Sequence, residues 1–317
     1  MPLPHLTELA ALNTQLQFNA NGLLFRQQPV DLLEKQAGSR LTALLYAECY
    51  AKKQYFQTHP APPANGDDDG AFQQQLSASN HATGYTDAAW MVQHILPDHR
   101  IVVFKHNAQQ VIEASQIVHP ASLVPKTGDL VTVQFPGESR TLQQGFYYVH
   151  SNTPFDGSGQ LLRLYWNITA PGAPVLIDTL TQLLNHYRIP FMFKCLDRPA
   201  QYIRRDSSVL YLSYRHYAMV SRLRPFILPL VTPYLHDDVP LFTHPLSAGT
   251  GIAESPATNE SFGLHRMGIV SDALLACFQQ QLHAPEQRMA TIAACFTRQG
   301  IDLHTPYLNK GSHFIFN

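Results

Sequence analysis

The stretch LLRLYWNITAPGAPVLIDTLTQLLNHYRIPFMFKC, residues 161–195, decides the fold class. Residues 161–168 alternate between two faces, as in a strand, with Leu162, Leu164, Trp166 and Ile168 on one and Arg163, Tyr165 and Asn167 on the other. Apolar residues then recur every three or four positions up to Tyr187, which predicts a helix packed on one side. IPFMFKC, residues 189–195, predicts a second strand.

Strands and helices continue on both sides of this unit. Further strands are predicted at RIVVFKH (100–106), DLVTVQF (129–135), GFYYVH (145–150) and SVLYLSY (208–214). Helices are predicted at 217–235, where Pro225, Pro229 and Pro233 should break or kink the chain, at 261–282 and at 286–298. Without any internal repeat, this order predicts an α+β fold, a mixed or antiparallel sheet flanked by helices.

The sequence predicts three parts. Residues 1–57 have helical spacing and form a helical lead-in, which is either a docking surface or a structural cap. Residues 58–84 are rich in Pro, Gly, Asp, Gln and Asn and predict a flexible loop or linker. We expect residues 85–317 to form the main α+β domain.

Composition excludes several classes of protein. Of the 317 residues, 45% are hydrophobic and 14% are charged, which is typical of a globular protein. The net charge of −1 argues against wholesale binding to nucleic acid or to a membrane surface. No apolar run is long enough to span a bilayer and the start lacks signal-peptide features, so we expect a cytoplasmic protein.

Metal and nucleotide motifs are absent from the sequence. The cysteines Cys49, Cys195, Cys277 and Cys295 are isolated, which favours reduced thiols over a disulfide framework or a CxxC metal pair. HExxH, GxxxxGK[ST], GxGxxG after a strand and GxSxG do not occur. We therefore expect neither a metal site nor a cofactor.

Basic residues gather in one region of a nearly neutral chain. Residues 187–236 contain seven arginines and Lys194 against Asp197 and Asp206. Guanidinium groups suit phosphate or carboxylate recognition, so the cluster indicates an anionic ligand, with a solvated basic face as the alternative.

Lys194 is the strongest candidate for a reactive group. Strand alternation places it with Met192 on the face opposite Phe191, Phe193 and Cys195. If that face is partly enclosed and lined by arginines, the amine should have a lowered pKa and serve as a general base. The alternative is a lysine whose ammonium group extends to water.

The segment QYIRRDSSVLY, residues 201–211, adds further candidates. Arg204 and Arg205 are adjacent ahead of a strand, so at least one should point inward, and Asp206 either orients one of them or completes a turn. Ser261 is a plausible N-cap that places His265 and Arg266 near a helix N-terminus, where an anion would compensate their charge. With sixteen histidines in the chain, His265 and His150 are individually more often structural than catalytic.

Six segments together resemble the HopA-type family. In order they are GFYYVH (145–150), RLYWNI (163–168), TLTQLLNHYRIPFMFK (179–194), YIRRDSSVLY (202–211), VPLFTHPLSAGTGIAESP (239–256) and SFGLHR (261–266). The resemblance covers roughly residues 85–300. The family includes type III effectors of plant pathogens and the HopA-like lyase component of class V lanthipeptide biosynthesis, which eliminates phosphate from phosphoserine or phosphothreonine.

The resemblance implies roles for the residues already singled out. Lys194 would be the base, and His150 or His265 the acid. The phosphate would be bound by Arg163, Arg204, Arg205 and Arg266, with Tyr202 as an orienting donor. The implied partners are a phosphorylated precursor peptide and a kinase and a cyclase of the same pathway, with no metal or cofactor.

Two other functions stay open at this point. One is a non-catalytic phosphopeptide-binding subunit, and the other is a host-directed effector. No long Ser- and Gln-rich secretion segment precedes the domain, which favours a biosynthetic or otherwise intracellular protein.

Overall fold

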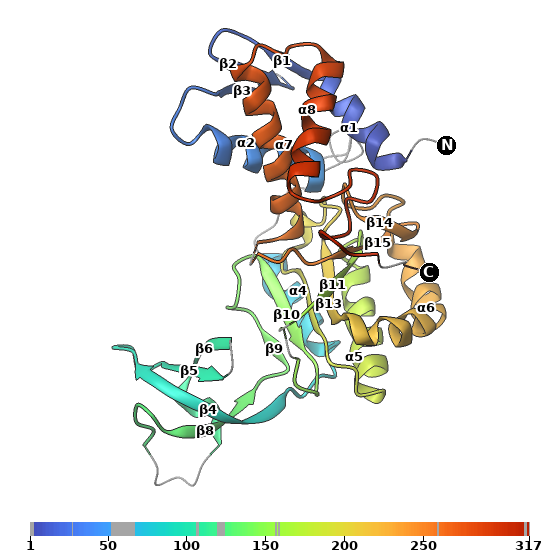
Figure 1. The fold of residues 1–317 in the computed structure, drawn as a ribbon. Coiled ribbons are helices and arrows are strands. Elements are labelled where there is room, and N and C mark those ends of the chain that lie inside the picture. The colour runs from blue at the N-terminus through green and yellow to red at the C-terminus, as the bar shows by residue number, and fades with distance from the viewer. Residues whose placement is uncertain are drawn as a thin grey trace.

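A seven-stranded antiparallel sheet lies at the centre of the molecule (Figure 1). The computed structural model describes residues 3–26, 28–51, 67–105, 108–118, 124–155, 157, 159–258, 260–313 and 316. The strands of the sheet are, in spatial order, β14 (His244–Ser247), β15 (Thr250–Glu254), β11 (Leu161–Trp166), β13 (Ser208–Ser213), β12 (Met192–Leu196), β10 (Phe146–His150) and β9 (Glu138–Ser139). This sheet and the helices around it confirm the predicted α+β class.

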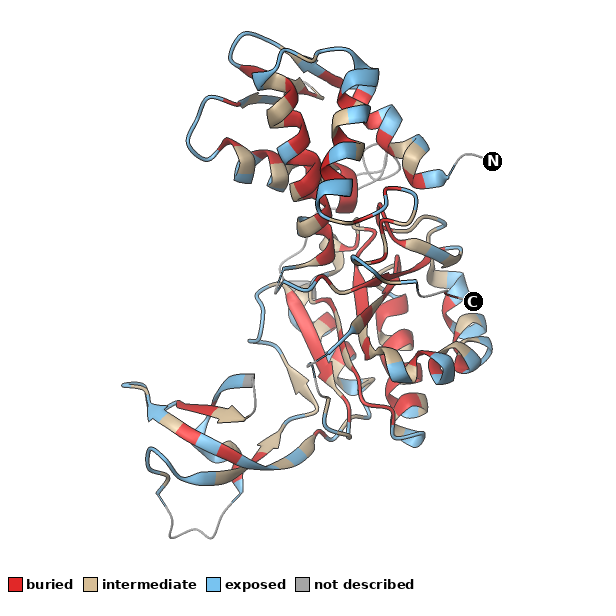
Figure 2. Ribbon diagram, in the orientation of Figure 1, coloured by how far each residue is buried: buried red, intermediate tan, exposed pale blue. Residues whose placement is uncertain are grey.

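One face of this sheet is apolar and packs on three helices. These are α5 (Gly172–His186), α6 (Tyr217–Val231) and α4 (Asp67–Ala78). Leu162 and Leu164 of β11 lie on this face, as the alternation predicts, and pack in one core with Leu176 and Leu180 of α5. Each fully buried leucine contributes about 1.5–3 kcal/mol of transfer free energy, so this core holds the sheet and helices together. Figure 2 shows the resulting buried interior.

Helix α6 is not broken at two of the three prolines where we expected a break or a kink. Pro225 and Pro229 lie inside the helix, which ends at Val231, before Pro233. The buried side of α6 consists of Tyr217, Val220, Leu223, Ile227 and Val231. Burial of this stripe offsets the backbone hydrogen bonds that the prolines remove.

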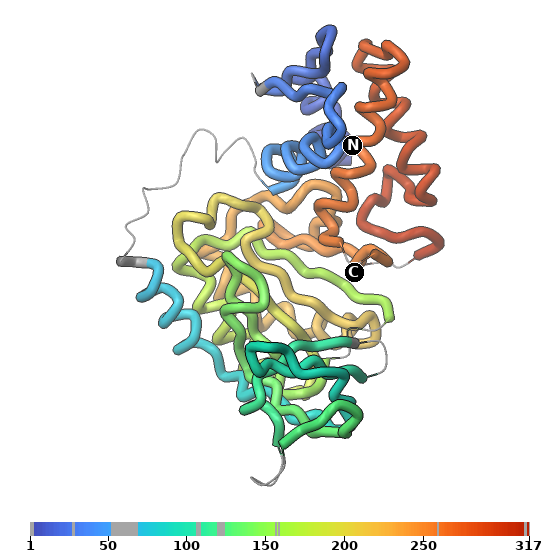
Figure 3. Tube along the Cα trace, turned by 90° about the vertical axis from the view of Figure 1, so that its left-hand side faces the viewer, coloured from blue at the N-terminus to red at the C-terminus, as the bar shows by residue number. Residues whose placement is uncertain are grey.

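The two ends of the chain form one further layer. It contains α1 (Pro4–Thr14), β1 (Leu16–Phe18), β2 (Gly22–Phe25), β3 (Gln28–Asp31), α2 (Ala37–Leu45), the π-helix η1 (Tyr46–Ala51), α7 (Phe262–Gln279) and α8 (Pro285–Arg298). Arg288 of α8 donates to the Asn13 carbonyl (2.7 Å) and side chain (2.6 Å). Figure 3 shows these N- and C-terminal segments side by side. The N-terminal segment is therefore built into the domain.

Residues 16–31 correct the all-helical prediction for residues 1–57. They form a small antiparallel sheet of β1, β2 and β3, in which Leu23 and Phe25 are buried. The strands are three or four residues long, too short for their period to be distinguished from a helical one.

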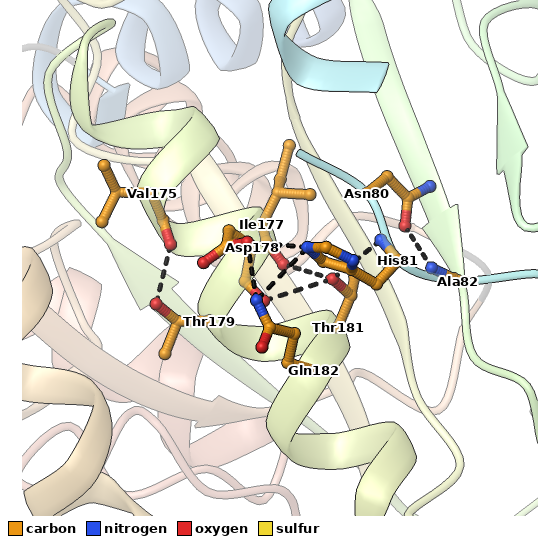
Figure 4. A network of polar contacts seen from close by, with 9 residues as sticks. All are labelled: Asn80, His81, Ala82, Val175, Ile177, Asp178, Thr179, Thr181 and Gln182. Atoms are coloured by element: carbon orange, nitrogen blue, oxygen red, sulfur yellow. Dashed lines mark hydrogen bonds and ion pairs between the residues drawn. The ribbon is translucent and has the colours of Figure 1, made fainter. Parts of the chain in front are cut away.

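Part of the predicted linker at 58–84 is ordered, and residues 58–66 of it lie outside the described residues. Helix α4 packs Phe72 and Leu76 into the main core. His81 then binds α5, because its Nε2 lies 2.7 Å from Asp178 Oδ1 and its backbone N–H donates to Thr181 Oγ1 at 3.1 Å (Figure 4). Gln182 donates to the same carboxylate oxygen at 2.7 Å. The segment therefore fixes where the next part of the chain begins.

Residues 85–135 form a separate five-stranded antiparallel sheet. Its strands are β6 (Ala108–Ile112), β5 (Ile101–Lys105), β4 (Tyr85–Ile95), β8 (Leu130–Phe135) and β7 (Ile117–Val118), in spatial order. This sheet has its own small core around Trp90 and Val103. Its two ends meet where Gly84 lies against Phe135 and Gly137 lies against Ala82, with no room for a Cβ at either glycine. The five-stranded sheet is therefore an insertion whose ends adjoin.

Short 3-10 helices complete the described elements: η2 (Ala114–Gln116), η3 (Pro199–Gln201), η4 (Tyr214–His216) and η5 (Thr232–Tyr234). The four cysteines are free and buried, as expected. Among the helices in the described ranges, none combines the length and the apolar character needed to cross a bilayer.

Candidate functional site

The second face of the seven-stranded sheet carries polar and aromatic groups. Lys194 pairs directly with Tyr148 of β10 and with Val209 of β13, and Arg163 of β11 pairs with Tyr211 of β13. Directly opposed residues in an antiparallel sheet project to the same side. Lys194, Arg163, Tyr148 and Tyr211 therefore share this face, which we call the polar face.

Aromatic rings and one amide surround the Lys194 amine. Its Nζ lies 4.2 Å from the ring centre of Phe146 and 5.7 Å from that of Tyr148. Nζ also donates to Gln143 Oε1 at 3.0 Å. Burial lowers the pKa of Lys194 to about 8; Asp206 opposes this shift, and Arg163 and Arg204 add to it.

Arg204 lies beside the same ring as the Lys194 amine. Its Cζ lies 6.0 Å from the ring centre of Phe146, so Arg204 and Lys194 share one aromatic ring. Nε and Nη2 each donate to Asp206 at 2.9 Å, and Nη2 also donates to the Tyr46 hydroxyl at 2.8 Å. Nη1 makes no hydrogen bond within the described residues, which leaves one edge of the guanidinium for an anion.

Asp206 holds Arg204 and Tyr46 together. The Tyr46 hydroxyl donates to Asp206 Oδ2 at 2.8 Å. Burial alone would raise the pKa of the Asp206 carboxyl, but the Arg204 charge and the hydrogen bonds outweigh it and lower that pKa. Asp206 is thus ionised and orients Arg204, as one of the two sequence interpretations proposed.

Arg163 lies on the same face, closer to helix α7. Its Nε donates to Ser255 Oγ at 2.9 Å and its Nη2 to the Glu260 carbonyl at 3.0 Å. Its Cζ lies 5.4 Å from the ring centre of Tyr211. Arg163 is half-buried, so an anion on the polar face would meet a second fixed cation there.

Arg205 departs from its expected role as a phosphate ligand. Its side chain is 0% exposed and forms an ion pair with Glu8 at 2.9 Å. Its backbone N–H donates to the Ala51 carbonyl at 2.7 Å, its Nε donates to the Tyr50 carbonyl at 3.1 Å, and its Nη2 donates to the Cys49 carbonyl. Arg205 thus satisfies the carbonyls that end the π-helix η1, which carries Tyr46 at its start.

Arg266 and His265 form a second internal contact at the start of α7. Ser261 caps this helix by accepting from the Leu264 N–H at 3.2 Å, as predicted. Arg266 is 0% exposed and donates to the carbonyls of Pro306 (2.8 Å) and Leu308 (3.0 Å). These hydrogen bonds occupy the Arg266 guanidinium, which we expected to bind phosphate.

The contact between these two residues fixes the state of His265. Arg266 Nη1 lies 2.8 Å from His265 Nδ1. A guanidinium can only donate, so Nδ1 accepts and the imidazole is neutral with its proton on Nε2. Burial and the Arg266 charge lower the pKa of His265, in agreement with this state.

Tyr202 also departs from its expected role. Its hydroxyl donates to the Leu196 carbonyl at 2.7 Å, and its ring packs edge-on against Phe72 of α4 at 5.6 Å. Tyr202 therefore belongs to the apolar core behind the sheet, on the side opposite Lys194.

His150 lies on the polar face. It is two residues after Tyr148 on β10, and the two rings stack with centres 6.5 Å apart. Burial lowers the pKa of His150. The structure thus brings together Lys194, Arg163, Arg204 and His150 of the predicted set.

Sequence reasoning missed the groups that hold these side chains. Gln143 comes from the turn before β10, and Phe146 and Tyr148 come from β10 itself, where only the alternation in GFYYVH could have placed the two rings together. No pattern in the sequence indicates that Tyr46 belongs to the site, because its contact with Arg204 spans 158 positions of sequence. In the part of the chain that is described, no group of three or more His, Cys, Asp or Glu side chains is placed to hold a metal ion.

Solved structures similar to the chain include two effector proteins. One, from Pseudomonas syringae pv. tomato strain DC3000, is 16% identical, with 87% of this chain and 98% of that chain covered and a TM-score of 0.48. The other, from Pseudomonas syringae pv. syringae strain 61, is 13% identical, with 86% and 96% covered and a TM-score of 0.47. No curated protein matches the chain.

Family membership follows from the sequence itself. Residues 138–308 match the HopA1 effector protein family, which is more than half of the 317 residues. The matched region contains the whole seven-stranded sheet and the residues gathered on its polar face. The chain therefore belongs to the HopA1 effector protein family.

Proposed function

We propose that the protein is a carbon–oxygen lyase that removes phosphate from phosphoserine or phosphothreonine by β-elimination. The observation that carries this proposal is the Lys194 amine, with a pKa of about 8, beside Arg204 on the polar face. A weakly basic amine next to fixed guanidiniums suits an anionic substrate that must lose a carbon-bound proton.

Lys194 is the base in this mechanism. An amine of pKa about 8 is neutral in roughly a tenth of the molecules at pH 7, far more than an ordinary lysine. Its lone pair takes the proton from Cα of the phosphorylated residue. The electron pair of that C–H bond then forms the Cα=Cβ double bond.

Arg204 and Arg163 are the phosphate ligands. The Cβ–O bond breaks and its electron pair leaves with the phosphate, so negative charge grows on the bridging oxygen. Arg204 offers its Nη1 edge to this group, and Arg163 offers a second positive charge from β11. Arg205 and Arg266 act through the fold, since their donors are engaged by protein carbonyls.

His150 is the acid that protonates the departing phosphate. It shares the polar face with Lys194, and β10 places it beside Tyr148, the cross-strand partner of Lys194. His265 is less suited, because Arg266 occupies its Nδ1. The products are inorganic phosphate and a dehydroamino acid. The same chemistry serves a precursor peptide in a maturation pathway or a host phosphoprotein.

Mass spectrometry of a mixed phosphoserine and phosphothreonine peptide library tests the proposal. Elimination removes about 98 Da from each substrate peptide, whereas hydrolysis by a phosphatase would remove about 80 Da. Lys194→Ala should abolish the loss. Lys105→Ala is the matched control, since Lys105 lies in the five-stranded sheet and pairs with Asp87 at 2.6 Å.

The outcome distinguishes the competing functions. Phosphopeptide binding without any change of mass would identify a non-catalytic binding subunit. Full activity in Lys194→Ala would reject the assigned base. An effector that acts through host contact alone would show neither phosphate-dependent binding nor turnover.

A further inference from the structure

Gln143 occupies an unusual position beside the proposed base. Its Oε1 accepts from Lys194 Nζ at 3.0 Å and from the Tyr148 hydroxyl at 2.7 Å. One amide oxygen thus joins the lysine of β12 to the tyrosine directly opposite it on β10.

The turn before β10 is built to present this side chain. Ser139 Oγ accepts from the backbone N–H groups of Thr141 (3.4 Å) and Leu142 (3.2 Å). The Gln143 carbonyl accepts from the Phe146 N–H at 3.2 Å, and Gly145 has a φ of +83°, a conformation that favours glycine. These local bonds fix the backbone of Gln143, which is otherwise exposed.

Lys194 alone would not hold its amine in one place. A lysine side chain loses rotamer entropy when it is fixed. The rings of Phe146 and Tyr148 restrict the position of Nζ, but a ring face does not direct an individual N–H bond. Gln143 Oε1 directs one N–H bond of the Lys194 amine, because it accepts a hydrogen bond from it. The remaining tetrahedral positions of the nitrogen then point away from the turn.

We infer that Gln143 is a positioning residue that orients the Lys194 amine for proton abstraction without adding charge. This inference rests on the proposed function. A neutral amide is the suitable partner, since it accepts a hydrogen bond yet stabilises the ammonium form less than a carboxylate would. A glutamate at position 143 would form an ion pair with Lys194 and keep it protonated.

Other ionisable groups also face the Lys194 amine. They are Asp206 and Arg204 from the segment before β13, Arg163 of β11, Tyr211 of β13, and Tyr148 and His150 of β10. Asp206 is the acidic group among them, and it is already bonded to Arg204 and Tyr46. A carboxylate at position 143 would therefore add a negative charge in direct contact with Lys194, which Asp206 does not supply.

The experiment compares Gln143→Glu with Gln144→Glu in the full chain. Gln144 is adjacent to Gln143, and both residues are exposed. Gln144→Glu therefore introduces the same charge one residue away. An amine-selective acylating reagent is applied across a pH series, and mass spectrometry measures the labelled fraction of Lys194. This readout gives the titration midpoint of Lys194 without any turnover.

We expect Gln143→Glu to move that midpoint upward by about 1–3 pH units, the usual effect of an opposite charge in contact. Gln144→Glu should move it by less than about half a unit, since its charge is screened by water. Equal midpoints in the two variants would overturn the inference.

Elimination rates provide the second readout. The pH above which phosphate release falls below half its maximal rate should rise in Gln143→Glu by the same amount as the labelling midpoint. Gln143→Leu should lower kcat about tenfold and leave KM nearly unchanged, and a change in KM alone would contradict a positioning role. A shifted labelling midpoint in a protein that releases no phosphate would reject the proposed lyase and leave the Gln143–Lys194 contact standing.

Discussion

At the scale of single residues, the protein places a weakly basic amine among fixed cations. Lys194 has a pKa of about 8, while Arg204 and Arg163 are held by Asp206, Ser255 and a backbone carbonyl. The cations are therefore held in place without a ligand, and under the proposed function their orientation would cost nothing at the moment of reaction.

The first prediction concerns the pH dependence of elimination. The Lys194 base must be neutral and the His150 acid protonated. Because the pKa of His150 is lowered, the rate should be level between the two pKa values and fall about tenfold per pH unit above the Lys194 pKa of about 8. Initial rates of phosphate release between about pH 6 and pH 9 measure this profile. A rate that does not fall above about pH 8 would show that Lys194 and His150 are not the base and the acid.

The second prediction concerns Asp206 and acid stability. The pKa of Asp206 is lowered in the folded protein, so its stabilisation is complete above its unfolded pKa of about 4 and is lost as the pH falls through the lowered folded value. Asp206→Asn should cost about 1–3 kcal/mol at pH 7, and its stability should fall less between about pH 4 and pH 2. Urea unfolding followed by circular dichroism measures both effects.

Asp237→Asn is the control for that prediction. Asp237 is exposed, so its replacement should leave the free energy of unfolding within about 0.5 kcal/mol of the parent. Parallel losses of stability in acid for the parent chain and Asp206→Asn would contradict the assigned ionisation.

At the scale of secondary-structure elements, the π-helix η1 connects the terminal layer to the site. Tyr46, at its start, bonds Arg204 and Asp206, while Arg205 satisfies the carbonyls at its end. Helix α7 packs directly against η1, and Gly263 allows the close approach. A Cβ on Gly263 would lie 2.5 Å from a Tyr50 ring atom and 2.6 Å from a Tyr46 ring atom.

The third prediction follows from this contact. Gly263→Ala should destabilise the protein by about 1–3 kcal/mol and displace Tyr46, which weakens its hold on Arg204. Gly268→Ala, on the same helix, meets open space and should instead stabilise by about 0.5–1 kcal/mol through its better helix propensity. Thermal unfolding of both variants gives the comparison, and equal stabilities would show that α7 and η1 are not tightly packed.

The sequence predicts a helix or strand well where the apolar pattern stays regular over many residues. The alternation in LLRLYWNI and the leucine spacing of α5 give β11 and α5 correctly, and with them the faces of Arg163 and Lys194. Strands of three or four residues, such as β1 to β3, lack enough positions to reveal their period. Nothing local in YAECYA distinguishes a π-helix from an α-helix.

The candidate site could be predicted only as far as strand alternation extends. Alternation assigns Lys194 and Arg163 each to one face of its own strand, and only the strand pairing in the structure shows that the two faces are the same. The roles of Arg205, Arg266 and Tyr202 depend on backbone carbonyls brought near by tertiary packing, and no pattern in residues 201–211 or 261–266 reports those partners.

At the scale of the whole molecule, the protein consists of a central sheet with helices on one face, a layer made from both chain ends on the other, and an inserted sheet (Figure 1). The inserted sheet has its own core, and its two ends adjoin at Gly84 and Gly137. We therefore expect that the inserted sheet can be removed without disturbing the candidate site on the polar face.

The fourth prediction tests that separability. Replacing residues 85–135 by a short Gly-Ser linker should leave the main sheet folded, because the cores around Trp90 and Leu164 share no buried residue. Cooperative thermal unfolding and an unchanged labelling midpoint for Lys194 are the expected results. Loss of cooperative unfolding would instead make the inserted sheet an integral part of the fold.

The layer formed by the two chain ends has a consequence for biosynthesis. Residues 4–51 bury their apolar side chains against α7 and α8, which leave the ribosome roughly 250 residues later. At about 5–20 residues per second, that interval lasts on the order of tens of seconds. Tyr46 is packed in this layer, so its contact with Arg204 forms only after the final helices have emerged.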